Sequence, residues 1–219
     1  MGMGYLGLIV VTLIIGFGAS AYVNSQIKKY HKVPISTGLT GAQAARKMLD
    51  HYGLNHVEVR RGKAGQDFYD PRSKSITLDP DSYEGVSITA TATACHEAGH
   101  ACQHAQNYAP MKIRSAIVPV VNLASNAWMF LLIAGIMLNI AGLIDAAIIM
   151  YACAVVFQIV TLPVEFNASS RAMTYMNETG ILQAEQGGAF AVLRACALTY
   201  VAATLTSILQ LLWLLGQRD

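Results

Sequence analysis

The chain has 219 residues, of which 54% are hydrophobic and only 13% are charged. Soluble domains average about 25% charged residues, so this composition argues against an ordinary soluble domain and predicts segments inside a lipid bilayer. The formal net charge is only +2, which gives no reason to expect a nucleic-acid partner. The four cysteines form no CxxC pair, and we interpret them as small buried apolar residues rather than as disulfides.

Four uncharged stretches are each long enough to cross a bilayer, which takes about 20 apolar residues. Asp145 stands between the second and the third stretch, and we interpret it as a tight hairpin at a membrane face. We therefore predict a mainly α membrane protein whose transmembrane helices cover about 4–24, 116–140, 145–164 and 195–216.

The first stretch has an alternative interpretation as a cleaved signal peptide, because Ala19-Ser20-Ala21 resembles a cleavage site. No Lys or Arg precedes the apolar run, however, and the positive charges follow it. That order favours an uncleaved span.

Lysine and arginine are concentrated on one side of the predicted spans. All of them except Arg218 fall in the segments 25–114 and 165–194. Segments rich in Lys and Arg stay in the cytoplasm. We therefore expect both segments inside the cell and both chain ends outside it.

Residues 25–114 are polar enough to form a small α+β segment in water. "TGAQAARKMLDHYGL" predicts a helix, with Thr40 and Gln43 forming a capping box and Gly53 just after the end. "HVEVRR" and "DFYDPRSKSITLD" predict short strands, and a further helix should run from about 85 to 106. No long linker interrupts the chain, so we expect one integrated domain over 1–219.

The most informative motif is His96-Glu97-Ala98-Gly99-His100, which fits H-E-x-x-H. On a helix, positions i and i+4 share a face, so the two imidazoles can bind one zinc ion. Glu97 then lies about 100° around the helix, where its carboxylate can act as general base on a zinc-bound water. The alternative is a helix whose histidines are satisfied at a membrane surface without metal.

A zinc peptidase site needs a third protein ligand and leaves a fourth position to water. His104 is one candidate, but ligands at i, i+4 and i+8 of a straight helix cannot converge on one ion, so we interpret it as a supporting or surface residue. Glu165 is the stronger candidate, because a charge at the end of a span is costly unless it is paired or bound to metal. An ordinary ion pair with Arg171 or a lysine is its alternative role, while Glu178 and Glu185 lie in a more hydrophilic stretch.

Several longer segments resemble one known family in the same order along the chain. These are "KKYHKVPISTGLTGAQAARKML", "FYDPRSKSITLD", "HEAGHACQH", "YAPMKIRSAIVPVVN", "TLPVEFNASSRA" and "LRACALTYVAATLTSILQLL". They resemble the bacterial neutral zinc metallopeptidases of the YugP type, and the arrangement is similar to the membrane gluzincins of the HtpX and CAAX-protease type. The resemblance implies a zincin-like cytoplasmic segment in a multi-pass protein of the bacterial cell membrane. It also implies His96, His100 and Glu165 as Zn²⁺ ligands and Glu97 as base.

One position departs from the related gluzincins, which favour an aspartate four residues after the glutamate ligand to support a zinc-bound histidine. Ser169 stands there in this chain, and Asn167 lies nearby, so support for the ligands is in question. By the same resemblance, 75–78 is either an edge strand that pairs with substrate or a core strand. Stabilising the oxyanion requires an electrophile, for which the candidates are Tyr175, Arg171 and His104.

We therefore predict an integral membrane zinc endopeptidase that cleaves peptide or protein substrates at the cytoplasmic membrane interface. Two alternatives belong to other classes: an adaptor that binds zinc without turnover, and a structural membrane protein with no metal. The intact Glu97 favours the enzyme, because a site without catalysis has no use for that carboxylate. The sequence determines neither the substrate preference nor the oligomeric state.

Overall fold

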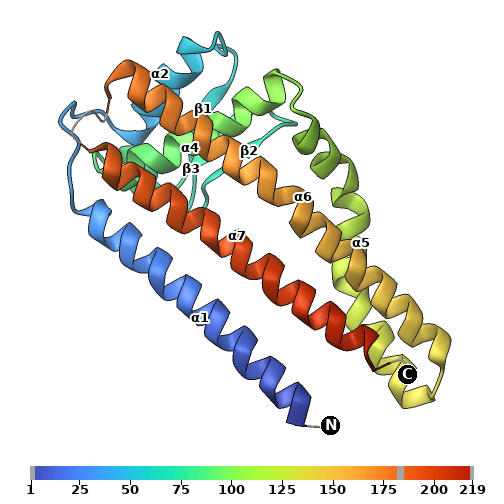
Figure 1. Cartoon of the computed structure of the whole chain (residues 1–219). Helices are drawn as coiled ribbons and strands as arrows, with labels where there is room; N and C mark the ends of the chain where they lie inside the picture. Colours follow the sequence, from blue (N-terminus) through green and yellow to red (C-terminus); the bar gives the residue numbers. More distant parts are fainter. Residues whose placement is uncertain (1–2, 182–184, 218–219) are drawn as a thin grey trace.

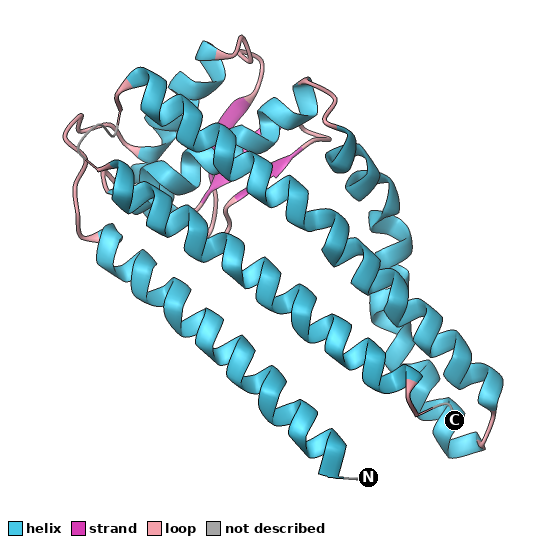
Figure 2. Ribbon diagram, viewed as in Figure 1, coloured by secondary structure: helices cyan, strands magenta, loops and turns pink. Residues whose placement is uncertain are grey.

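The computed structural model describes residues 3–181 and 185–217, so the predicted cytoplasmic segment 165–194 is described in part and Arg218 lies outside the described residues. Four long helices run alongside one another, and the shorter elements gather at one end of them (Figures 1 and 2). In chain order the elements are α1 (Met3–His31), α2 (Gly41–His51), β1 (Glu58–Arg61), β2 (Phe68–Asp70), β3 (Ser75–Leu78), α3 (Pro80–Glu84), α4 (Ile88–Ala105), α5 (Ala109–Leu138), α6 (Ala141–Thr179) and α7 (Gln186–Leu215).

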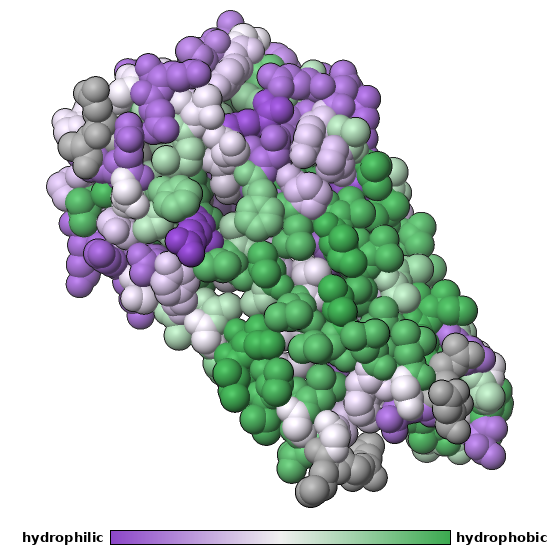
Figure 3. All heavy atoms as spheres, viewed as in Figure 1, coloured by the Kyte–Doolittle hydropathy of each residue, from purple (hydrophilic) through white to green (hydrophobic). Residues whose placement is uncertain are grey.

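Helices α1, α5, α6 and α7 are long and apolar enough to cross a membrane, which confirms the expectation of four such segments. Figure 3 shows apolar side chains covering the part of the molecule formed by these long helices, whereas hydrophilic side chains cover the end that carries the sheet. The helices extend beyond the predicted spans. Helix α6 has 39 residues, and at a rise of 1.5 Å its length is roughly 58 Å, about twice the hydrocarbon thickness of a bilayer. One continuous helix therefore joins the apolar region to the polar end.

The prediction of a hairpin turn at Asp145 was wrong, since that residue lies inside α6. The turn comes earlier, where Asn139 ends α5 in the left-handed conformation with φ of 54°. Asparagine tolerates this conformation better than most residues. Gly135 also makes the turn compact, because a Cβ there would lie 2.9 Å from the Ile144 backbone nitrogen. A charge ends an apolar run, but backbone conformation decides where the helix ends.

The three strands form one sheet in the order β1-β3-β2. Strand β3 pairs in parallel with β1 and antiparallel with β2. Both of its edges are thus occupied, so of the two interpretations of 75–78 the core strand is confirmed and the edge strand was wrong. The capping box of Thr40 and Gln43 is present at the start of α2.

The buried core lies where the sheet, α2, α4 and the polar ends of α6 and α7 meet. Helix α4 runs through the centre of this region, and most of its residues are buried. Its neighbours contribute Met48 and Leu49 from α2, Ile76 from β3, Met176 from α6 and Val192 from α7, all nearly inaccessible to solvent. Packing of α4 on every side fixes the orientation of the H-E-x-x-H motif that it carries.

Candidate metal centre

Helix α4 approaches α6 closely at the glycine of the motif. A Cβ added to Gly99 would lie 2.6 Å from the Ala168 carbonyl oxygen, closer than any ordinary contact. The absence of a side chain at this position therefore lets the backbones of α4 and α6 touch. That contact brings Glu165, one turn before Ala168, to the histidine face of α4.

Two histidines and one glutamate meet at this contact. Atom Oε2 of Glu165 lies 3.2 Å from Nε2 of His96 and 3.6 Å from Nε2 of His100. Each of the three residues offers a ligand atom, and these atoms all lie within 4.8 Å of one another. Among the described residues this is the one group of at least three His, Cys, Asp or Glu that could hold a metal ion.

The donor set fits a zinc ion. Two imidazole nitrogens and a carboxylate oxygen are the ligands of many catalytic zinc sites, which keep a fourth position open. The Glu165 side chain is only 3% exposed, and a carboxylate so deeply buried needs a cation or hydrogen-bond donors. Burial by itself lowers the pKa of His100, but the nearby carboxylates of Glu165 and Glu97 outweigh burial and raise that pKa. The acidic groups around His100 thus favour a cation at this position.

The second oxygen of Glu165 faces an arginine that the sequence did not single out. Nη1 of Arg114, in α5, lies 3.5 Å from Oε1, whereas the two histidines face Oε2. The carboxylate is therefore divided between two partners. One oxygen is turned to the candidate ligands and the other to the guanidinium group.

Glu97 is buried on α4, with 8% of its surface exposed. It follows His96 directly but is not part of the three-residue ligand group. Its negative charge contributes to raising the pKa of His100.

Comparisons with known proteins agree with this geometry. A family model described as "Putative neutral zinc metallopeptidase" matches residues 5–218, almost the whole chain. The chain belongs to this family. A Bacillus subtilis (strain 168) protein named "Putative membrane protease YugP" is 44% identical over 213 residues, which cover 96% of this chain and 94% of that protein. No solved structure matches the chain significantly. The resemblance stated from the sequence motifs is thereby confirmed.

In this member of the family, different side chains support the two histidines. Ser169 Oγ, four residues after Glu165, lies 3.1 Å from Nδ1 of His96. Gln103 Oε1 lies 3.0 Å from Nδ1 of His100. Sequence analysis missed Gln103, although its place three residues after a candidate ligand on a buried helix was a usable signal. Asn167 accepts a hydrogen bond from Gln103.

The three candidates for stabilising an oxyanion are all engaged elsewhere. Tyr175 is buried beside the rings of His51 and Tyr52. Arg171 donates to Asn167 and Gln106. His104 lies outside the ligand group, and its Nδ1 is 2.8 Å from the hydroxyl of Tyr69. Of the lysines and arginines in the described residues, Arg114 is the one that forms an ion pair with Glu165.

Proposed function

We propose that the chain is an integral membrane zinc endopeptidase that hydrolyses peptide bonds in peptide or protein substrates. The observation that carries this proposal is the meeting of His96, His100 and Glu165, with Glu97 beside them on the same helix. We assign the first three as Zn²⁺ ligands and Glu97 as the general base. Membership in a family described as zinc metallopeptidases supports the assignment.

A bound Zn²⁺ would lower the pKa of a water molecule and polarise the scissile carbonyl group. The chain's own residues supply the rest. His96 and His100 present their Nε2 atoms from one face of α4, and Glu165 presents Oε2 from α6. Glu97 accepts the proton of the attacking water and passes it to the amine that leaves.

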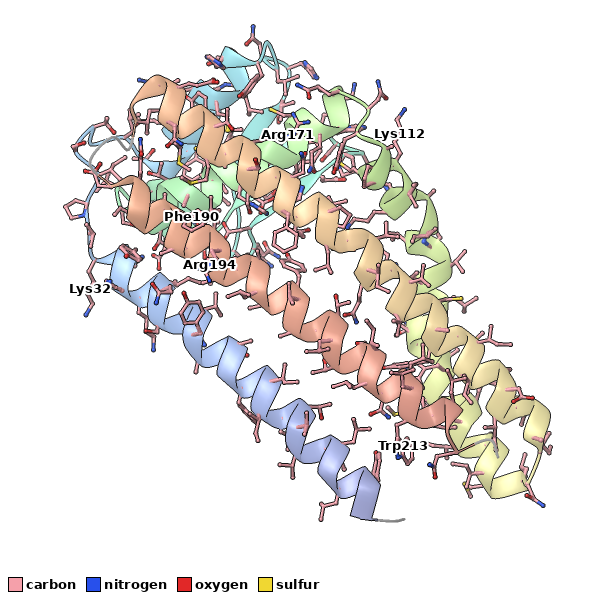
Figure 4. All side chains as sticks on the ribbon, viewed as in Figure 1. Lys32, Lys112, Arg171, Phe190, Arg194 and Trp213 are labelled. Carbon is pink, nitrogen blue, oxygen red and sulfur yellow. The ribbon has the colours of Figure 1, made fainter. Side chains whose placement is uncertain are left out.

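We further propose that the site faces the cytoplasm, within a zincin-like segment that is continuous with the spans as one domain over 1–219. The basic residues labelled in Figure 4, among them Lys32, Lys112 and Arg171, lie toward the end that carries the sheet, whereas Trp213 lies toward the other end. The end of a membrane protein that is rich in Lys and Arg normally faces the cytoplasm. The shared core of α4, α6 and α7 supports a single domain.

Glu97→Gln tests the mechanism, since it keeps the size of the side chain and removes its basicity. We expect peptide or casein cleavage by the purified protein to fall about 10²–10⁴-fold, the usual range for a lost general base. Zinc content, measured on the same samples, should stay near that of the original protein. Equal cleavage by both proteins would refute the mechanism.

Two other results would point to the alternative classes. Stoichiometric zinc with no cleavage of any substrate by the unmodified protein would favour a zinc-binding adaptor. An absence of zinc after purification with added metal, together with an absence of cleavage, would favour a structural membrane protein. Each result is distinct from the loss of activity in Glu97→Gln alone.

A further inference from the structure

We propose that Gln103 fixes the tautomer of His100, so that Nδ1 carries the proton and Nε2 is left free for the metal. The inference rests on the metal site of the proposed function and assigns a positioning residue to it. A neutral imidazole carries its proton on either nitrogen. Only one of the two forms presents an unprotonated Nε2 toward Glu165.

Gln103 is completely buried, and its whole side-chain amide is used. Its oxygen Oε1 lies 3.0 Å from Nδ1 of His100. Its nitrogen Nε2 donates to the main-chain carbonyl of Val164 at 2.7 Å and to Oδ1 of Asn167 at 3.0 Å. A buried amide with a partner for every polar atom has a fixed orientation, because any rotation would leave polar atoms unpaired.

The neighbours of Gln103 exclude the opposite orientation of its amide. The carbonyl oxygen of Val164 can only accept a hydrogen bond, so it must face the amide nitrogen. Asn167 is fixed in the same way, because its Oδ1 accepts from Nε of Arg171 at 2.7 Å, and arginine can only donate. Turning the Gln103 amide around would set its oxygen against two oxygens that have no proton to offer.

This orientation determines the protonation of His100. Because the oxygen of Gln103 faces Nδ1 of His100 and carries no hydrogen, Nδ1 must supply the proton. Nε2 of the neutral ring then keeps its lone pair, and this is the atom 3.6 Å from Oε2 of Glu165. In zinc sites, the hydrogen bond donated by the ring nitrogen that does not bind the metal orients the histidine and sets its tautomer in this way.

At its Nδ1, the other candidate ligand has no such constraint. His96 faces the hydroxyl of Ser169, which can either donate or accept. The two histidines therefore differ: one tautomer is set by a polar network that reaches Arg171, and the other can adjust when metal binds. Because Gln103 also holds the carbonyl of Val164, the residue before Glu165, it ties α6 to α4 beside the third ligand.

The tautomer can be measured directly in the unmodified protein without metal. We expect ¹⁵N spectra of histidine-labelled protein in micelles, with His100 assigned through its loss in His100→Gln, to show a protonated Nδ1 and an unprotonated Nε2 in neutral His100. A proton on Nε2 would overturn the inference. This result does not depend on cleavage activity, so it is separable from a failure of the proposed function.

Two variants of Gln103 separate tautomer control from packing. Gln103→Met keeps the volume but removes the acceptor, and should give mixed tautomers of His100 and zinc binding about 10–100-fold weaker in competition with a chelator. Gln103→Glu keeps an acceptor, and should retain the Nδ1 proton of His100.

The matched control is Gln106→Met, an identical change at the end of α4 in a residue that contacts Arg171 but not His100. It should leave the tautomer unchanged and zinc affinity within about twofold. Equal losses in Gln103→Met and Gln106→Met, or an unchanged tautomer in Gln103→Met, would contradict the role assigned to Gln103.

Discussion

Gly99→Ala tests whether the close approach of α4 and α6 builds the metal centre. The new Cβ would lie 2.6 Å from the Ala168 carbonyl oxygen, and ordinary van der Waals contact begins at 3.4 Å. The two helices would have to separate by about 0.8 Å, since backbone on both sides leaves no flexible side chain to yield. Zinc sites tolerate deviations of only about 0.2 Å in ligand distance. Glu165 would therefore leave its position as a ligand.

The magnitude follows from the strain. Overpacking a core by one methyl group costs about 1–3 kcal/mol. If the helices relieve this strain by separating, zinc can bind only when they come back together. Zinc binding then costs the same ~1–3 kcal/mol, which corresponds to an affinity about 5- to 150-fold weaker. Alanine also stabilises a helix over glycine by about 1 kcal/mol. The net loss in stability of the metal-free protein should therefore be small, at most about 2 kcal/mol.

The assay is competition for zinc between the purified protein and a chelator, combined with thermal unfolding followed by circular dichroism. Gly142→Ala is the matched control, because it makes the same change in α6 at a site where a Cβ meets no atom within 4 Å. Its zinc affinity should equal that of the unmodified protein. If Gly99→Ala also binds zinc with unchanged affinity, the helix contact does not position the ligands and the reasoning is refuted.

Two further predictions concern the ligand set and the core. Glu165→Ala should abolish stoichiometric zinc after desalting, whereas His104→Ala should keep about one zinc per chain because His104 lies outside the ligand group; the reverse pattern would show that the ligands are misassigned. Leu49→Ala should lower the free energy of unfolding by about 2–5 kcal/mol, as usual for a fully buried leucine, while the exposed Lys47→Ala should change it by less than about 0.5 kcal/mol. If chemical denaturation gave the same loss of unfolding free energy for Leu49→Ala and Lys47→Ala, Leu49 would not belong to the core.

The sequence carried the local features of this protein well. Helical spacing placed His96 and His100 on one face of a helix, and the capping box at Thr40 marked the start of α2. These features depend on residues three or four positions apart, so the amino-acid sequence is enough to predict them. The long apolar runs likewise indicated α1, α5, α6 and α7, since hydropathy over about 20 residues is a property of the segment itself.

Choosing Glu165 from the sequence used a different kind of information. Burying a charge at a membrane boundary requires a partner, and that requirement singled out one acid although the chain gave no distance. The structure places its Oε2 3.2 Å from a histidine 69 positions away. The contact itself depends on Gly99, whose importance is visible only when Ala168 is seen against it.

Tertiary structure alone decided which polar side chains surround the cluster. Arg114 has no special spacing, and the spacing of Gln103 and Ser169 only makes them candidates. Their contacts arise because α4, α5 and α6 converge at one point. The order of the strands is also decided by tertiary structure. The composition of 75–78 suits an edge strand and a central strand equally, and only its pairing with β1 and β2 makes β3 central. The sequence thus determined the elements and placed the two candidate histidine ligands and the proposed base on one helix, because these features are local. Packing between distant helices determined the third candidate ligand's geometry and the hydrogen bonds that orient the histidines, because those depend on how closely two backbones approach.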